Sequence, residues 1–210
     1  MKYIRIFWSA VLAGVCIAIG GTAFLAADDR AVGALLFGVG LFLVVSCGFH
    51  LYTGKIGDLL DHPPVFLLEL LIVWCGNLLG AAAVGAGVAA TRMTGYVQKA
   101  GTLADAKLSD TPLSILLLSA FCGFLVYMAV YLYRASKDKL VGVAAVFACV
   151  MAFVLCGFEH CVANMFYFTV GGAWSGQAVG YLLLMTLGNS LGGLLVPAGQ
   201  KLFHRQERAQ

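Results

Sequence analysis

Long runs of residues without a charged side chain alternate with short charged connections along the chain. Five such runs lie at residues 6–27, 31–49, 70–91, 111–133 and 140–158. Another uncharged stretch, from residue 161 to residue 200, is too long for one helix and is divided by the glycine-rich residues 171–176. Because about 20 apolar residues let a helix cross a bilayer, we expect six membrane spans. Their approximate limits are residues 4–27, 31–60, 64–91, 111–134, 139–170 and 174–200.

The composition excludes the main alternatives to a membrane protein. The 210 residues are 61% hydrophobic and 11% charged, with a mean hydropathy of +0.94, whereas soluble domains carry about 25% charged residues. A net charge of +3 without a basic stripe argues against nucleic-acid binding. The apolar content argues against disorder. We therefore expect an all-α integral membrane protein that forms a single domain over residues 1–210.

The basic residues in the connections predict the orientation, because cytoplasmic loops carry an excess of Lys and Arg. With the N-terminus inside, the cytoplasmic side holds Lys2, Arg5, Lys55, Arg134, Lys137, Lys139, Lys201, Arg205 and Arg208. The outer side then holds Arg30, Arg92, Lys99 and Lys107. This asymmetry predicts a multi-pass protein of the inner (plasma) membrane with both termini in the cytoplasm.

The two halves of the chain repeat one another. Three pairs of similar segments occur in the same order, namely Ser9-Ala10 with Ser119-Ala120, residues 47–50 with 156–159, and residues 76–80 with 188–192. The second member follows the first by 110, 109 and 112 residues, respectively. A repeat of three spans has an odd number of crossings, so its second copy must run in the opposite direction. We expect two inverted repeats, about residues 4–91 and 111–200, with a pore at their interface.

Polar residues interrupt the second and fifth spans at corresponding places. The interruptions read Gly-Phe-His-Leu-Tyr-Thr-Gly-Lys at residues 48–55 and Gly-Phe-Glu-His-Cys-Val-Ala-Asn at residues 157–164. Polar backbone at membrane depth requires burial in protein or a wet cavity. We expect two broken helices whose positive N-terminal ends meet near the midplane and, with the Thr53 hydroxyl, favour a small anion. The alternative is a pair of packed kinks with ordinary buried polar residues.

These interruptions resemble the motifs of one membrane family. Residues 157–166 are similar to the fifth-span signature of the formate/nitrite transporter family, and Leu51-Tyr52-Thr53 resembles its Ω-loop, usually Leu-Phe-Thr. Because the first span begins near residue 4, the chain resembles a short member without an N-terminal gating helix. The resemblance implies a homopentamer of aquaporin-like protomers. Each protomer would have its own pore for small monovalent anions such as formate, nitrite, lactate or hydrosulfide.

The resemblance also implies roles along that pore. His160 corresponds to the central histidine of the family, and Thr53 to its partner from the Ω-loop. The implied movable constriction consists of Leu41, Leu51 and Tyr52, and the implied second narrow ring of Phe37, Val126 and Phe153.

Further implied roles concern the charges near the histidine. Lys107 and Glu159 would set the electric field around it, and Asn164 would brace the loop. Gly123 replaces an Asn of the family and would remove one hydrogen-bond partner of the Glu–Lys arrangement. His50 is an extra ionisable group. Lys107 is expected at the end of a solvated outer loop, residues 92–110.

Two transport mechanisms remain open for the central histidine. A carboxylate is costly to bring into a medium of low dielectric constant. His160 could give it a proton, since histidine titrates near pH 6.5, or could stay neutral and donate a hydrogen bond. We expect transport of formate or nitrite, without a cofactor.

Two other functions compete with anion transport. A pore for neutral solutes is disfavoured because paired Asn-Pro-Ala elements are missing and only residues 163–165 come close. A membrane enzyme using Cys156, Glu159 and His160 is disfavoured because no second catalytic cluster or cofactor motif is visible. A metal site at Cys156, His160 and Cys161 is disfavoured for the same lack of a second ligand cluster.

Overall fold

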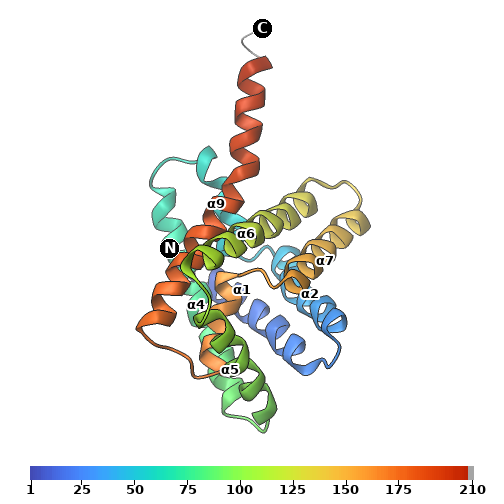
Figure 1. The fold of residues 1–210 in the computed structure, drawn as a ribbon. Helices are drawn as coiled ribbons and strands as arrows, with labels where there is room; N and C mark the ends of the chain where they lie inside the picture. Colours follow the sequence, from blue (N-terminus) through green and yellow to red (C-terminus); the bar gives the residue numbers. More distant parts are fainter. Residues whose placement is uncertain (208–210) are drawn as a thin grey trace.

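The computed structural model describes residues 1–207, and over that range the chain consists of helices and short connections (Figure 1). Within these residues six helices are long and apolar enough to cross a membrane. They are α1 (Lys2–Ala26), α2 (Arg30–Cys47), α4 (Phe66–Ala89), α6 (Pro112–Ala135), α7 (Lys139–Cys156) and α9 (Gly176–Glu207). The expectation of six spans is confirmed. Residues 208–210, including Arg208, and the side chain of Arg205 lie outside the described part of the chain.

Both broken spans are present, but their second halves differ. The fifth span consists of α7 followed by α8 (Cys161–Val170), a regular half-helix. In the second span, α2 is followed by a single turn, α3 (Tyr52–Lys55), and then by the 3-10 helix η1 (Ile56–Asp61). The residue before a proline is pushed out of the helical region, and His62, which precedes Pro63, is extended at φ −123° and ψ 155°. The half-helix of the first repeat is therefore mostly a 3-10 helix, and it ends at Asp61, just before Pro63 and Pro64.

Helices α2 and α7 begin and end in the same way. Asp29 accepts a hydrogen bond from the backbone of α2, and Asp138 does the same for α7. Each helix ends at a glycine in the left-handed conformation, Gly48 at φ 69° and Gly157 at φ 72°. Glycine adopts this conformation without steric cost, so it ends the helix abruptly at C′. These matching glycines place the breaks.

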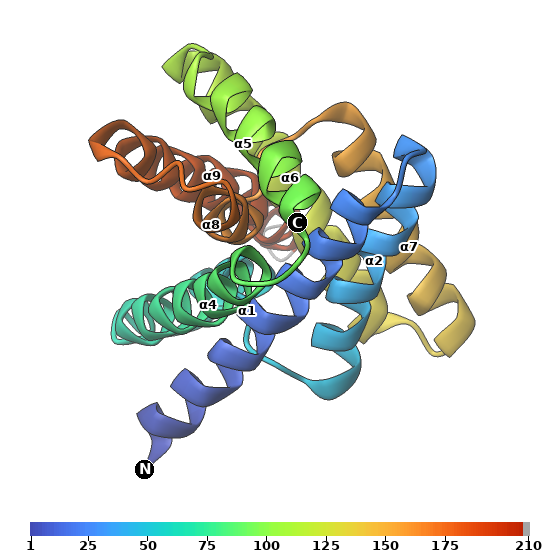
Figure 2. The ribbon, with the colours of Figure 1, turned by 90° about the horizontal axis from the view of Figure 1, so that it is seen from below.

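The two repeats pack by the same pairwise contacts. In the first repeat α1 packs against α4 and α2, and in the second α6 packs against α9 and α7. Helices α2 and α7 contact each other between the repeats, and α4 packs along α8. Figure 2 shows α2 and α7 on one side of the molecule, with α4 and α9 on the other. The half-helices therefore lie inside a ring of spanning helices.

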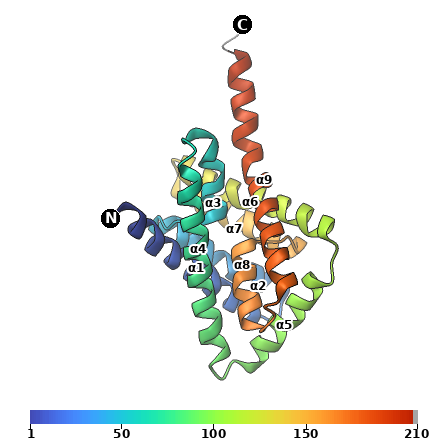
Figure 3. The ribbon, with the colours of Figure 1, turned by 90° about the vertical axis from the view of Figure 1, so that its left-hand side faces the viewer.

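The connection between the repeats is folded, which corrects the expectation of a solvated loop. Residues Thr94–Leu108 form helix α5, which runs from the end of α4 toward the start of α6 (Figure 3). Ala100 and Ala104 are fully buried, and α5 packs against α8. Small side chains let the two helices approach closely. This contact holds the last turn of α5 against the second break.

Candidate functional site

Asn77, in the middle of α4, holds the break of the first repeat. Its side-chain oxygen accepts the backbone N–H of Tyr52 at 2.9 Å. Its amide nitrogen donates to the carbonyls of Ala10, at 2.8 Å, and His50, at 2.9 Å. A buried backbone group without a partner costs about 1–3 kcal/mol. One side chain therefore satisfies two backbone groups that the break leaves without helical partners, the N–H of Tyr52 and the carbonyl of His50, and ties them to α1 through the carbonyl of Ala10.

Asn189, in the middle of α9, does the same for the second repeat. It accepts the N–H of Cys161 at 2.9 Å. It donates to the carbonyls of Ser119, at 2.8 Å, and Glu159, at 2.7 Å. Sequence analysis used both asparagines only as repeat markers. The signal for their role was present, since each is a lone amide within a long apolar run.

The two hydrogen-bond sets place the halves in one register. They pair Ala10 with Ser119 and His50 with Glu159, positions that are 109 residues apart. The sequence match of Ser9 with Ser119 is therefore wrong by one residue. In the structural register, His50 occupies the place that Glu159 occupies in the other half.

His160 is the N-cap of α8 and is 3% exposed. Its Nδ1 accepts the backbone N–H of Ala163 at 3.1 Å. Its Nε2 lies 2.9 Å from Oγ1 of Thr53, which is fully buried. Because Nδ1 is an acceptor, the neutral ring carries its hydrogen on Nε2 and donates it to Thr53. The structure thus joins the two residues that the resemblance paired.

Glu159 lies beside this histidine and is 4% exposed. The ammonium of Lys107 contacts both carboxylate oxygens, at 2.9 and 2.6 Å. Asn164 donates to Glu159 at 2.8 Å and to the carbonyl of His160 at 3.1 Å. Among the described residues, Asn164 Oδ1 is the one buried side-chain polar atom without a hydrogen-bond partner. The carboxylate is neutralised, and an acceptor remains beside it.

Gly123 does not face this charge cluster, contrary to the expectation from the family pattern. A Cβ atom at position 123 would lie 2.1 Å from the backbone oxygen of Asn189, and one at Gly14 would lie 2.2 Å from that of Asn77. Both glycines therefore let helices cross closely at the bracing asparagines. A larger side chain at position 123 would meet α9 before it could reach Glu159.

Two cavities lie at opposite ends of α2 and α7. The His160 cavity, of about 90 Å³, includes His160 and Asn164 in its wall together with Arg30 and Lys107. Phe37 and Phe153 also line it, with ring centroids 5.8 Å apart in an edge-to-face contact.

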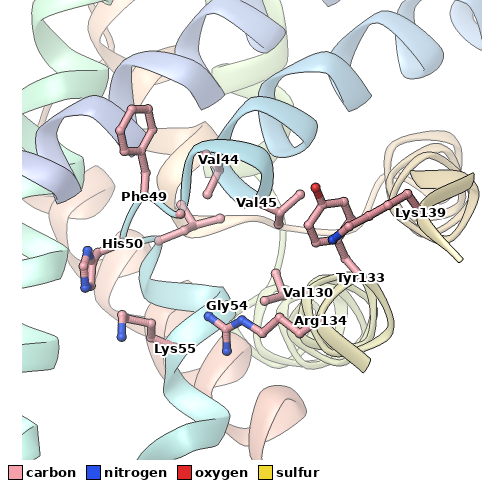
Figure 4. Close-up of a pocket in the computed structure, with 12 residues that line it drawn as sticks. Val44, Val45, Phe49, His50, Gly54, Lys55, Val130, Tyr133, Arg134 and Lys139 are labelled. Atoms are coloured by element: carbon pink, nitrogen blue, oxygen red, sulfur yellow. The ribbon is translucent and has the colours of Figure 1, made fainter. Parts of the chain in front are cut away.

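The basic cavity, of about 310 Å³, lies at the other end and is shown in Figure 4. Its basic residues are His50, Lys55, Arg134 and Lys139, and Leu51 and Val130 contribute to its apolar wall.

Buried apolar side chains of α2 and α6 lie along the helices between the two cavities. Leu41 lies one turn from Phe37 and about one turn from Val44, which lines the basic cavity. Val126 is one turn before Val130 on α6. Leu41, Leu51 and Val126 are each 1–2% exposed. They belong to one buried apolar cluster that also contains Phe37 and Phe153.

Tyr52 is the predicted constriction residue that the structure places elsewhere. Its hydroxyl lies 2.8 Å from Ser190 Oγ on α9. Its ring lines a separate groove with Trp74 and Leu183. Successive residues of a tight turn point in different directions, so Leu51 faces the basic cavity while Tyr52 faces α9.

These features together define the fold of a membrane transport protein: inverted repeats, two broken spans, and a buried histidine between two cation-lined cavities. The chain belongs to the formate/nitrite transporter family, whose model matches residues 1–202. It is 34% identical over 178 residues to the uncharacterized transporter YrhG of Bacillus subtilis, covering 77% of this chain and 66% of that protein.

Two further comparisons agree with this membership. The chain is 33% identical over 199 residues to a probable formate transporter of Methanothermobacter thermautotrophicus, covering 80% of this chain and 73% of that one. The solved structure of a pentameric formate channel with formate bound superposes with a TM-score of 0.83 at 24% identity, covering 97% of this chain and 98% of that one. The matched region thus spans roughly two thirds of the length of the first relative, and the solved structure shares the fold.

Proposed function

We propose that the protein conducts small monovalent anions, formate or nitrite, through a pore that passes the His160–Thr53 pair. The observation that carries this proposal is the position of that buried pair between two cavities whose walls carry Lys or Arg side chains. Cations at both mouths raise the local concentration of an anion. Phe37, Phe153, Leu41, Leu51 and Val126 keep the path between the cavities apolar, which excludes larger and multiply charged solutes.

The capping geometry supports hydrogen-bond donation by a neutral His160. Proton transfer through this residue requires an imidazolium, which carries hydrogen on both ring nitrogens. A hydrogen on Nδ1 would face the N–H of Ala163, and the charge would sit at the positive end of α8. The neutral ring instead donates to Thr53, whose hydroxyl hydrogen is left to hydrogen-bond the passing anion.

The assembly follows the same proposal. A single channel domain covers residues 1–210, with repeats at about 4–91 and 111–200, and five copies form a homopentamer. The fold shared with a pentameric formate channel supports this, as do exposed apolar side chains along the spanning helices. Native mass spectrometry in mild detergent tests the assembly, and a predominantly monomeric, transport-active protein contradicts it.

The orientation is also part of the proposal. The protein resides in the inner (plasma) membrane with both termini in the cytoplasm. Lys55, Arg134 and Lys139 gather around one cavity, whereas Arg30 and Lys107 line the other. This separation agrees with the distribution of Lys and Arg between the two sides and makes the basic cavity the cytoplasmic one.

Anion uptake by proteoliposomes tests the central site. Wild-type protein should carry formate or nitrite and generate a membrane potential. Asn is also a good N-cap, so His160→Asn should still assemble. It removes the donor to Thr53 and should lower anion flux by up to about tenfold, the effect of one hydrogen bond worth about 1.4 kcal/mol. His62→Asn, at an exposed position, is the matched control.

The outcomes of this assay separate the competing functions. Rapid water or glycerol permeation without anion flux would support a neutral-solute pore. Substrate turnover without flux would support an enzyme. Equal anion flux in wild type and His160→Asn would refute the role of the histidine.

A further inference from the structure

His50 occupies the repeat-related position of Glu159, but the two residues have opposite surroundings. Glu159 is neutralised by Lys107. His50 lies partly buried at the wall of the basic cavity, together with Lys55, Arg134 and Lys139. The residues that line this cavity include no carboxylate. The cavity beside the first break therefore holds a titratable base and three cations, of which Arg134 and Lys139 come from the second repeat, whereas the second break holds an acid paired with Lys107.

Ser9 on α1 holds the His50 ring in a way that suits both protonation states. The backbone N–H of His50 donates to Ser9 Oγ at 3.1 Å, and Nδ1 lies 2.6 Å from the same oxygen. When the ring is neutral, the hydroxyl can donate its hydrogen to Nδ1. When the ring is protonated, the oxygen still has a lone pair for Nδ1–H. His50 thus differs from His160, whose Nδ1 is occupied by an N–H donor.

Charged groups face His50 from several helices, and most of them are already paired. Arg134 of α6 lies 3.5 Å from Asp58, and Glu69 of α4 forms an ion pair with Lys2 of α1. Glu69 lines a small space with His50 and Lys55.

Two ammonium groups of the cavity remain without a carboxylate. Within the described chain, Lys55 and Lys139 have no carboxylate within ion-pair distance, and Lys139 lies over the ring of Tyr133 at 5.3 Å. The cavity therefore has an excess of positive charge that a mobile anion can balance.

We propose that the basic cavity is a second anion-binding site, at which a small carboxylate or nitrite binds together with a proton on His50. This inference rests on the proposed anion transport. An anion beside the imidazole favours its charged form, and the charged form in turn strengthens anion binding. The proton comes from solution on the side of this cavity and returns there when the anion leaves. At about 310 Å³ the cavity holds a small anion with several waters, since each water takes about 30 Å³.

The pH dependence of formate uptake tests the site. Initial rates are measured in proteoliposomes at equal pH on both sides, after subtraction of the rate in protein-free vesicles. For wild type, the half-saturating formate concentration should rise several-fold between pH 5.5 and 7.5, because loss of the proton from His50 weakens anion binding. His50→Gln should show a high value that does not change with pH, and His50→Lys a low one. His62→Gln, another histidine of the same repeat outside the cavity, should follow the wild-type profile.

Calorimetry on the wild-type protein supplies a measurement that needs no variant. Nitrite binding near pH 7 is followed in two buffers of different ionisation enthalpy. The difference in heat gives the protons taken up per anion. Proton uptake supports the site. A wild-type pH profile in His50→Gln, or binding without proton uptake, overturns it. A wild-type protein that carries neither formate nor nitrite would instead refute the proposed function.

Discussion

The two breaks share a backbone arrangement and differ in the chemistry of their side chains. Each follows a left-handed glycine, each is held by an asparagine on the third spanning helix of its repeat, and each begins a half-helix. The side chains at the corresponding positions are His50 and Leu51 in the first break, and Glu159 and His160 in the second. The scaffold thus depends on backbone hydrogen bonds that are alike in both halves, and the two mouths are free to carry different charges.

The largest expected effect comes from removing the shared scaffold. Asn77→Ala and Asn189→Ala each leave two buried backbone groups of a break without partners and also lose the hydrogen bond to a neighbouring helix, so each should destabilise the protein by about 2–6 kcal/mol. Thermal unfolding in detergent, followed by size-exclusion chromatography, measures the loss. Gln177→Ala, which removes an exposed hydrogen bond to Leu108, is the control. A folded, stable Asn77→Ala protein would show that only one break needs its brace.

A smaller effect is expected at the charge pair found only in the second break. Lys107→Ala leaves Glu159 buried without its counter-charge, a change that costs about 3–5 kcal/mol in well-buried pairs. Lys107 retains some exposure, so the loss should fall below that range and below the loss in the asparagine variants, and anion flux should also drop.

Two further variants identify the source of that effect. The double variant Lys107→Ala/Glu159→Gln should recover most of the stability, because it removes both charges. Lys99→Ala, on the same helix, should change little, since its partner Asp28 is exposed. Equal behaviour of Lys99→Ala and Lys107→Ala in unfolding and flux would contradict a special role for Lys107.

The smallest effect is expected at the mouths. Arg30→Gln should raise the half-saturating anion concentration by about twofold at low salt, because Lys107 in the same cavity is already neutralised. Lys139→Gln should have less effect, because Lys55 shares its cavity without a carboxylate. Flux assays at low and high ionic strength measure both. The difference in half-saturating anion concentration between each variant and wild type should disappear at high salt. A difference that persists there would argue against long-range attraction.

The fold was largely predictable because the membrane imposes a simple rule on sequence. Runs without charge must be helices, and a polar Gly-Phe-His or Gly-Phe-Glu element within a run must be a break. Helix α5 was not predicted because many of its residues are polar. It is stabilised by packing against α8, with Ala100 and Ala104 buried. Such a contact depends on tertiary packing and leaves no periodic signal of its own.

The candidate site was predictable where residues lie close together in sequence. His160, Glu159 and Asn164 lie within one segment of ten residues, 157–166. The structure brings Thr53 and Lys107 to this segment. The contact of Ser9 with His50 joins residues 41 positions apart on different helices, which a single sequence does not reveal. The direction of Tyr52 and the crowding at Gly123 depend on side-chain orientation and helix crossing, for which the family pattern was the wrong guide.

Helix α5 has a consequence for how such a chain can be divided. By position it is a linker between duplicated halves, and a cut after Leu108 would leave each fragment with three of the spanning helices. The cut would divide an ion pair, because the amino-terminal fragment would carry Lys107 and the carboxy-terminal fragment would carry the buried Glu159. A split version of the protein should therefore reassemble with the ammonium as a recognition element. A carboxy-terminal half expressed alone would bury Glu159 without a counter-charge.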